Sequence, residues 1–246
     1  MNFRGISVLI TGANRGLGHA FTTELLALGV ARVYAAVRRP ETLATAFPDE
    51  PRVVPLQMDL TDLASIAAAA QAAPDISLLI NNAAHLEHGD LLSADGLAQL
   101  ERAWRVNVLG PLVVTRAFVP TLLRQKSAAL VNINTIASLC PFADVPAYAA
   151  SKAASLSVTQ ALRRELAPHG LPVYSVLPGV LDTEMAAWLN CAKADPRAVS
   201  RTVLAAVQRD EPGEIFPDDG AKEFWRGFKS DPSSILFVTP AANSSS

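Results

Sequence analysis

The stretch TGANRGLG, residues 11–18, lies between an apolar run and a helical pattern. The run before it, ISVLIT at residues 6–11, is apolar almost throughout, as expected for a strand buried on both faces. Gly12, Gly16 and Gly18 allow the backbone to turn tightly and to approach a bound group closely. A pyrophosphate at this turn would face the amino terminus of the next helix, whose dipole favours negative charge. The stretch therefore predicts a nucleotide-binding turn, with a plain tight turn as the alternative.

Short apolar runs alternate with helical stretches along the rest of the chain. Strands are predicted at residues 6–11, 32–37, 53–58, 77–81, 129–134 and 172–177. Helices are expected near residues 17–28, 62–73, 96–125, 146–167 and 196–209. Strands that are buried on both faces and alternate with helices indicate an α/β fold. We predict a doubly wound Rossmann fold with a mostly parallel, seven-stranded sheet and helices on both faces.

The composition suits one domain with a large core. Half of the 246 residues are apolar, 18% are charged, and the formal net charge of −2 predicts no attraction to nucleic acid or to an anionic membrane. Two cysteines are too few for a disulfide framework and favour a reducing compartment. No signal-like segment or membrane-spanning apolar run is evident, so we expect a cytoplasmic protein. The domain is predicted over residues 1–239, with a flexible tail at 240–246.

The end of the second predicted strand indicates which nucleotide binds. NAD-binding proteins usually carry a carboxylate there, but this strand ends in AAVRRP. Arg38 and Arg39 follow it, and Arg15 lies in the glycine turn. Guanidinium groups match the geometry of a 2′-phosphate, which favours NADP (NADPH); ordinary solvated arginines are the alternative. Asp59, after the third strand, is suited to an adenine amino group, and Asn82 follows the fourth strand among small residues that permit close cofactor approach.

Six motifs follow one another along the chain: TGxxxGxG at 11–18, Asp-Leu at 59–60, NNAA at 81–84, Asn107, YxxxK at 148–152 and PGVLDT at 178–183. Over roughly residues 5–217 the series resembles the short-chain dehydrogenase/reductase family. The resemblance implies an NADP-dependent enzyme like the carbonyl reductases, which interconverts a ketone or aldehyde with an alcohol. It implies cofactor contacts from Gly12, Asn14, Arg15, Gly16, Leu17, Gly18, Arg38, Asp59, Leu60, Asn82, Tyr148, Lys152, Pro178, Gly179, Val180 and Thr183.

The catalytic pair implied by the resemblance is Tyr148 and Lys152 in VPAYAASKAA, residues 145–154. Four residues span about one helical turn, so the two side chains share one face. In the family the tyrosine donates a proton to the carbonyl oxygen, and an adjacent ammonium favours the phenolate. We therefore expect Lys152 to lower the pKa of Tyr148 and to bind the nicotinamide ribose. Asn107 resembles the family asparagine that holds a water linking the lysine to solvent; an asparagine bonded to backbone is the alternative.

One catalytic position departs from the family pattern. The family usually has a serine thirteen residues before the tyrosine, and here that residue is Thr135. Its hydroxyl can serve the substrate oxygen equally well, although its methyl group could crowd the substrate. Ser138 is the alternative source of this hydroxyl, or else part of the pocket wall. Spacing favours Thr135.

The substrate pocket is expected to be apolar, for a small-to-medium apolar substrate. A mobile lid is predicted near residues 184–195, after the last long strand. The predicted pocket residues, for which core packing is the alternative, are Ser138, Cys140, Phe142, Met185 and Trp188. His85 and His88 have the spacing of metal ligands, but no third ligand is evident, so no metal site is predicted.

The predicted partners are a small-molecule substrate and further copies of the chain. The family commonly pairs through its fourth and fifth helices, and AASLSVTQAL at residues 153–162 offers small and apolar residues there. We expect a two-fold symmetric homodimer or homotetramer. A dinucleotide-sensing regulatory protein on the same fold is the alternative function, although the intact Tyr148, Lys152 and Asn107 argue against it. Dehydratase or epimerase chemistry is a third possibility, for which the chain is short.

Overall fold

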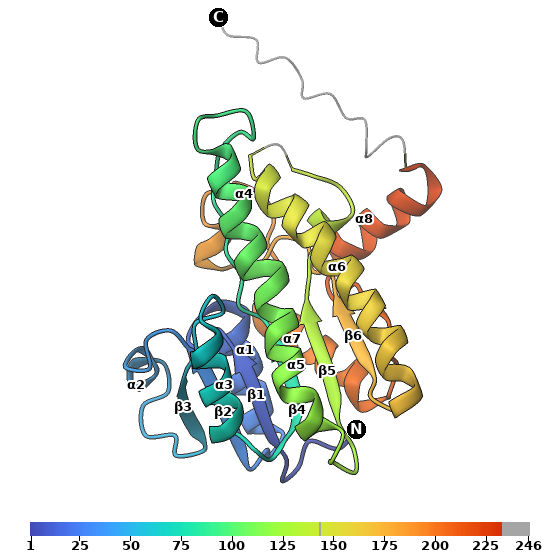
Figure 1. Cartoon of the computed structure of the whole chain (residues 1–246). Coiled ribbons are helices and arrows are strands. Elements are labelled where there is room, and N and C mark those ends of the chain that lie inside the picture. Colours follow the sequence, from blue (N-terminus) through green and yellow to red (C-terminus); the bar gives the residue numbers. More distant parts are fainter. Residues whose placement is uncertain (143, 233–246) are drawn as a thin grey trace, which may run out of the picture.

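Seven parallel strands form the centre of the structure, a computed structural model that describes residues 1–142 and 144–232 (Figure 1). They lie in the order β3-β2-β1-β4-β5-β6-β7. Their bounds are β1 Ser7–Thr11, β2 Arg32–Val37, β3 Val53–Gln57, β4 Ile76–Asn81, β5 Ala129–Ile133, β6 Val173–Val176 and β7 Glu214–Ile215. The predicted doubly wound fold is confirmed. The tail predicted at residues 240–246 lies outside the described residues.

Helices cover both faces of the sheet, as Figure 1 shows. Leu9 of β1 packs with α3, α5 and α6, whereas its neighbours Val8 and Ile10 pack with α1 and α7. Successive side chains of a strand point to opposite faces, so both sets are buried only because both faces are covered. The helices are α1 Gly16–Ala27, α2 Thr42–Ala46, α3 Leu63–Ala72, α4 Gly96–Trp104, α5 Gly110–Leu122, α6 Pro146–Leu166, α7 Pro196–Gln208 and α8 Asp219–Ser230.

The single helix predicted at residues 96–125 is interrupted. A π-helical turn, η1 Arg105–Leu109, separates α4 from α5. Pro111 has no N–H to donate to the carbonyl of Asn107 four residues earlier, so the regular α-helical ladder fails at this point. The backbone N–H of Gly110 instead reaches the carbonyl of Arg105, five residues back. The interruption places Asn107 on a locally widened turn.

Two further helices, α2 and α8, were not predicted. α8 contains two glycines and many charged residues, which obscured its helical pattern, but Asp218 caps it by accepting a hydrogen bond from the N–H of Ala221 at 2.8 Å. Short 3₁₀ turns lie at η2 Ile136–Ser138, η3 Ala167–His169 and η4 Glu184–Ala186. Within residues 1–142 and 144–232, no helix is both long and apolar enough to cross a membrane.

The strand order reverses between β1 and β4. From β1 the chain proceeds to β2 and β3 on one side of the sheet, and then returns to β4 on the other side of β1. In open α/β sheets the crevice outside the carboxyl ends of the strands at such a reversal is where ligands bind. The glycine turn follows β1, and Asn82 follows β4, so both lie at this crevice.

Candidate active site

A cavity of about 900 Å³ opens at the carboxyl ends of the strands. It runs from the loop after β2 to the segment after β6, and most of the predicted site residues line it. Those residues are Gly12, Asn14, Arg15, Gly16, Leu17, Arg38, Asp59, Leu60, Asn82, Thr135, Phe142, Tyr148, Lys152, Pro178, Gly179, Val180, Thr183, Met185 and Trp188. Residues distributed over most of the chain thus meet in one place.

Four predicted site residues do not line this cavity. Gly18 lies inside α1, where a Cβ atom would stand 2.1 Å from the carbonyl oxygen of Gly12, so this glycine permits close packing of helix and turn. Asn107 is fully buried behind the cavity wall. Ser138 and Cys140 are buried as well and do not form part of the described lining.

The glycine turn has the shape required to bind an anion. Gly12 and Gly16 have φ angles of +68° and +53°, which residues with a Cβ atom rarely adopt. No side chain caps the first turn of α1 at Arg15, so the amino terminus of this helix is open to an anionic group in the cavity. These features fit a dinucleotide pyrophosphate.

The glycine turn is tied to the loop after β2. Asn14 Nδ2 donates to Thr42 Oγ1 at 3.1 Å, and that hydroxyl donates to the carbonyl of Arg39 at 2.7 Å. Arg38 and Arg39 are exposed at this end of the cavity. The two neighbouring arginines therefore present positive charge where the ribose of an adenosine would lie, as the 2′-phosphate hypothesis requires.

Asp59 lies at the same end of the cavity, and its side chain is an ionised carboxylate. Hydrogen bonds from the backbone and side chain of Thr61, at 2.8 and 2.7 Å, lower the pKa of Asp59, and the charge of Arg38 acts in the same direction. Both Asp59 and Leu60 line the cavity. A carboxylate can accept from an exocyclic amine, so the site fits the predicted contact with adenine.

Tyr148 and Lys152 lie one turn apart on α6 and both face the cavity. The ammonium is 5.9 Å from the centre of the phenol ring. It donates to the carbonyl of Ile133, at the end of β5, at 2.7 Å. Burial lowers the pKa of Lys152 to about 8, so the side chain is still mainly cationic at neutral pH. The cavity thus contains a buried positive charge beside a phenol.

The pKa of Tyr148 is raised, whereas the sequence led us to expect a lowered value. Burial raises it, because a phenolate would lose its hydration, and a hydrogen bond with Thr135 opposes this effect only in part. The ammonium of Lys152 is bonded to the carbonyl of Ile133 and not to the phenol. In this structure the phenol is therefore protonated at neutral pH.

The structure brings Thr135, and not Ser138, next to Tyr148. Thr135 has an extended backbone, with φ of −170°, and caps η2 by accepting from the N–H of Ala137 at 3.2 Å. Its hydroxyl is hydrogen-bonded to Tyr148 and lines the cavity. Ser138 is the last residue of the same turn, and it does not belong to the described lining of the cavity.

The side-chain amide of Asn107 binds two segments of the protein together. It accepts from the N–H of His85 and donates to the carbonyl of His85, each at 2.8 Å. It also donates to Ser151 Oγ at 2.9 Å, and Ser151 donates to the carbonyl of Tyr148 at 2.7 Å. Asn107 thus holds the loop after β4 against the turn of α6 that carries Tyr148. His85 and Ser151 were not predicted to take part, since nothing local in the sequence marks these contacts.

Buried asparagines anchor α6 to the sheet. Asn81 Nδ2 donates to Asn132 Oδ1 at 2.9 Å, and Asn132 Nδ2 donates to Thr159 Oγ1 at 3.0 Å. All three residues are buried. Buried polar groups require partners of defined geometry, so this network sets the position of α6, and with it Tyr148, relative to the strands.

The outer part of the cavity has apolar walls. Phe142, Met185 and Trp188 all line it and are 41%, 39% and 40% exposed, so three large apolar side chains face the solvent around one opening. Trp188 lies in the predicted lid segment, and its ring meets that of His88 edge to face at 4.4 Å. The nearby His85 Nε2 stands 3.0 Å from Glu87 Oε1 instead. The two histidines therefore have different partners.

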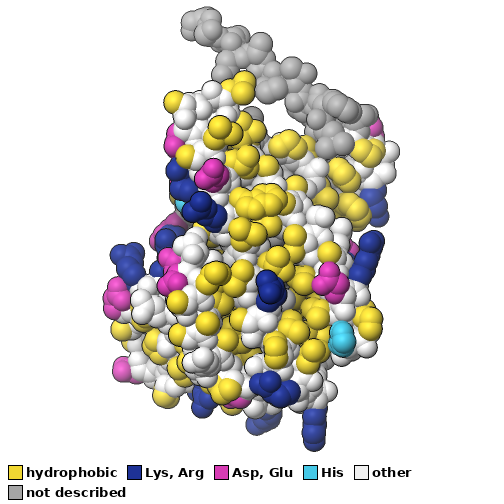
Figure 2. All heavy atoms as spheres, in the orientation of Figure 1, with side chains coloured by type: hydrophobic (Ala, Val, Ile, Leu, Met, Phe, Trp, Pro, Cys, Tyr) yellow, Lys and Arg dark blue, Asp and Glu magenta, His cyan; other side chains and the backbone are white. Residues whose placement is uncertain are grey.

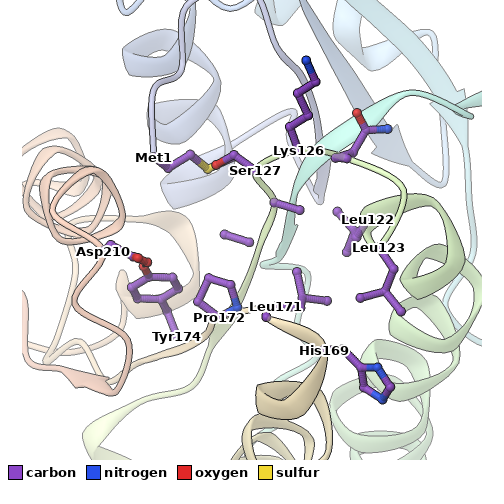
Figure 3. Close-up of a pocket in the computed structure, with 14 residues that line it drawn as sticks. Met1, Leu122, Leu123, Lys126, Ser127, His169, Leu171, Pro172, Tyr174 and Asp210 are labelled. Atoms are coloured by element: carbon purple, nitrogen blue, oxygen red, sulfur yellow. The ribbon is translucent and has the colours of Figure 1, made fainter.

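A second, smaller cavity of about 240 Å³ lies at the amino ends of β5 and β6 (Figure 3). Lys126, His169 and Asp210 are among its lining residues, and Tyr174 donates to Asp210 at 3.2 Å. None of the predicted site residues lines it. The site described above is thus confined to the carboxyl ends of the strands.

Comparison with known proteins identifies the family to which the chain is similar. The family model described as short chain dehydrogenase matches residues 7–194. A solved structure of a short chain dehydrogenase from Burkholderia cenocepacia J2315, in complex with NADP, is 36% identical and superposes with a TM-score of 0.88. The alignment covers 95% of this chain and 97% of that one.

Curated relatives of the chain are also named as dehydrogenases. The 2-(R)-hydroxypropyl-CoM dehydrogenase of Xanthobacter autotrophicus is 31% identical over 218 residues, which is 83% of this chain and 84% of that protein. Short chain dehydrogenase tazN of Aspergillus terreus is 30% identical over 197 residues, which is 75% of this chain. That alignment covers only 43% of the fungal protein, so the chain spans less than half of its length.

Proposed function

This chain belongs to the short chain dehydrogenase family of oxidoreductases, and on that basis we propose that it interconverts a ketone or aldehyde with an alcohol, using NADP(H) and Tyr148 as the proton shuttle. The observation that carries the proposal is the protonated phenol of Tyr148, hydrogen-bonded to Thr135 and one turn from the buried ammonium of Lys152. A protein that only senses a dinucleotide has no need of such an arrangement.

The chain's own residues suit an NADP(H) molecule. Gly12, Gly16 and the open amino terminus of α1 would hold the pyrophosphate, and Arg38 would hold the 2′-phosphate. Lys152 would bind the nicotinamide ribose, and Thr183 the nicotinamide carboxamide or a nearby phosphate. The bound cofactor supplies or accepts the hydride. The NADP complex of the Burkholderia cenocepacia relative supports this choice of nucleotide.

Proton transfer follows from the state of Tyr148. In the reducing direction the substrate oxygen would accept hydrogen bonds from Tyr148 and Thr135, and the phenol would give its proton to that oxygen as the carbonyl is reduced to the alcohol. The phenolate left behind is stabilised by the positive charge of Lys152, which is present below about pH 8. In the oxidising direction the same steps would occur in reverse, and the alcohol would give its proton to Tyr148.

The substrate is proposed to be small to medium and largely apolar, because Phe142, Met185 and Trp188 surround the outer cavity. NADPH consumption should be followed with a panel of aldehydes, aryl ketones, diketones, quinones and steroid ketones. Turnover of at least one class supports a reductase. Flat traces across the panel, together with tight NADPH binding, would favour the sensor alternative. A cytoplasmic location is part of the same proposal.

NADPH is expected to bind about ten- to a hundredfold more tightly than NADH. A charge-assisted contact between Arg38 and the 2′-phosphate is worth about 1.5–3 kcal/mol, which corresponds to that ratio. Fluorescence titration of both nucleotides measures it. Arg38→Asp should narrow or reverse the ratio, because it removes the guanidinium and repels the phosphate. Equal affinities in the unsubstituted protein would contradict the NADP assignment.

We also propose a homodimer or homotetramer formed through α5 and α6. Figure 2 shows apolar side chains gathered on the face of the molecule that it presents. Leu109 and Leu123, at the two ends of α5, are 44% and 41% exposed. Light scattering at micromolar concentration should give a mass of two or four chains. Leu123→Glu, at the end of α5, should shift the mass towards the monomer, whereas Leu28→Glu, at the end of α1 on the other face of the sheet, should not. A monomeric mass for the unsubstituted protein would refute the proposal.

A further inference from the structure

An ion pair crosses the cofactor cleft. Arg15 Nη1, at the end of the glycine turn, lies 2.5 Å from Glu184 Oε2. Glu184 is the first residue of η4, at the start of the predicted lid segment. Both residues line the main cavity, one from the beginning of α1 and the other from the segment after β6. The pair therefore joins the two sides of the cleft.

The residues on either side of Arg15 contact opposite walls of the cleft. On one side, a Cβ atom placed on Gly16 would lie 3.3 Å from the side chain of Thr183, so the glycine turn lies close to the residue that precedes the lid segment. On the other side, Asn14 is bonded to Thr42, the first residue of α2, which follows Arg38 along the chain. The guanidinium of Arg15 is directed to the first side in this structure, where Glu184 binds it.

The pair is weak enough to exchange. The side chains of Arg15 and Glu184 are 64% and 76% exposed, and ion pairs between such exposed groups contribute little to stability. A phosphate offers the same guanidinium stronger, bidentate and charge-assisted hydrogen bonds. A bound 2′-phosphate can therefore take Arg15 from Glu184, but it must do so in competition with a carboxylate that stays in the same cleft.

We propose that Glu184 is a selectivity residue that limits the preference for the 2′-phosphate by competing for Arg15. This inference rests on the proposed use of NADP(H). With NADH, which lacks the phosphate, the Arg15–Glu184 pair persists. With NADPH, the pair must open, and the freed carboxylate repels the phosphate. Glu184 thus narrows the difference in affinity between the two cofactors that Arg15 and Arg38 would otherwise produce.

Calorimetric titration of the full chain tests this without relying on activity. The probes are 2′,5′-ADP and 5′-AMP, which differ in the 2′-phosphate alone, followed by NADPH and NADH. Glu184→Gln is expected to tighten binding of 2′,5′-ADP and NADPH about threefold to fivefold and to leave 5′-AMP and NADH unchanged. In an Arg15→Gln background the same substitution should have no such selective effect. Asp182→Asn, another acidic residue on the cavity wall, is the matched control and should not discriminate between the probes.

Two results would overturn the inference. Weaker binding of all four probes to Glu184→Gln would mean that the pair helps to hold any nucleotide in the cleft. Unchanged binding of all four would mean that the pair is an ordinary surface contact. Failure of the proposed function is distinct from both, since it would appear as a lack of NADPH preference in the unsubstituted protein. The 2′,5′-ADP and 5′-AMP comparison still tests Glu184 in that case.

Discussion

Tyr148→Phe is expected to lower turnover about 10²- to 10⁴-fold, the loss typical of removing a positioned general acid. NADPH affinity should stay nearly unchanged, because the phenylalanine ring fills the same space on α6 and Lys152 keeps its bond to the carbonyl of Ile133. Steady-state kcat with the best substrate of the carbonyl panel, together with an NADPH titration, measures both quantities. A fall in kcat at constant affinity is the signature of a lost proton donor.

Tyr34→Phe is the matched control for this substitution. Tyr34 lies on β2, and its hydroxyl donates to Asp75 at 2.7 Å, outside the described lining of the main cavity. Its replacement removes one hydroxyl from the protein without touching the site, so kcat should stay close to that of the unsubstituted protein. Full reductase activity in Tyr148→Phe would mean that the proposed mechanism is wrong.

Thr135→Ala is expected to lower turnover about 10²- to 10³-fold, the range seen when one hydrogen-bond donor to a reacting oxygen is removed. Thr135→Ser should preserve or raise turnover, because it keeps the hydroxyl beside Tyr148 and removes a methyl group from the wall of the cavity. The serine also keeps the cap of η2, so the comparison separates the lost donor from any loss of structure. Steady-state kcat and the thermal unfolding midpoint of both variants are the measurements.

Ser138→Ala completes this series. Ser138 is buried and outside the described lining of the cavity, so its replacement should change kcat little. The reverse pattern, with a strongly lowered kcat in Ser138→Ala and an unchanged kcat in Thr135→Ala, would show that Ser138 provides the hydroxyl that binds the substrate oxygen. The spacing argument from Tyr148 would then be wrong.

The helix predicted at residues 96–125 shows a feature that the local sequence pattern did not predict. Its apolar periodicity identified helix correctly at both ends, but the π-helical turn at Arg105–Leu109 depends on Pro111 and on close packing at Gly110. A Cβ atom on Gly110 would lie 2.8 Å from the side chain of Leu60, which is distant in the sequence. Such a contact leaves no trace in the local pattern, so the interruption was not predicted.

The amino-acid sequence by itself determined the doubly wound sheet, the glycine turn after β1 and the placing of Tyr148 and Lys152 on one helical face. These features follow from short-range chemistry: burial of both strand faces, the φ angles open to glycine, and the helical period. Only the tertiary structure decided that Thr135 and not Ser138 meets Tyr148, that Asn107 joins His85 to Ser151, and that Arg15 pairs with Glu184. It also decided that the pKa of Tyr148 rises, because the desolvation of the phenol depends on all the atoms packed around it, and the four-residue spacing between Tyr148 and Lys152 does not determine that packing.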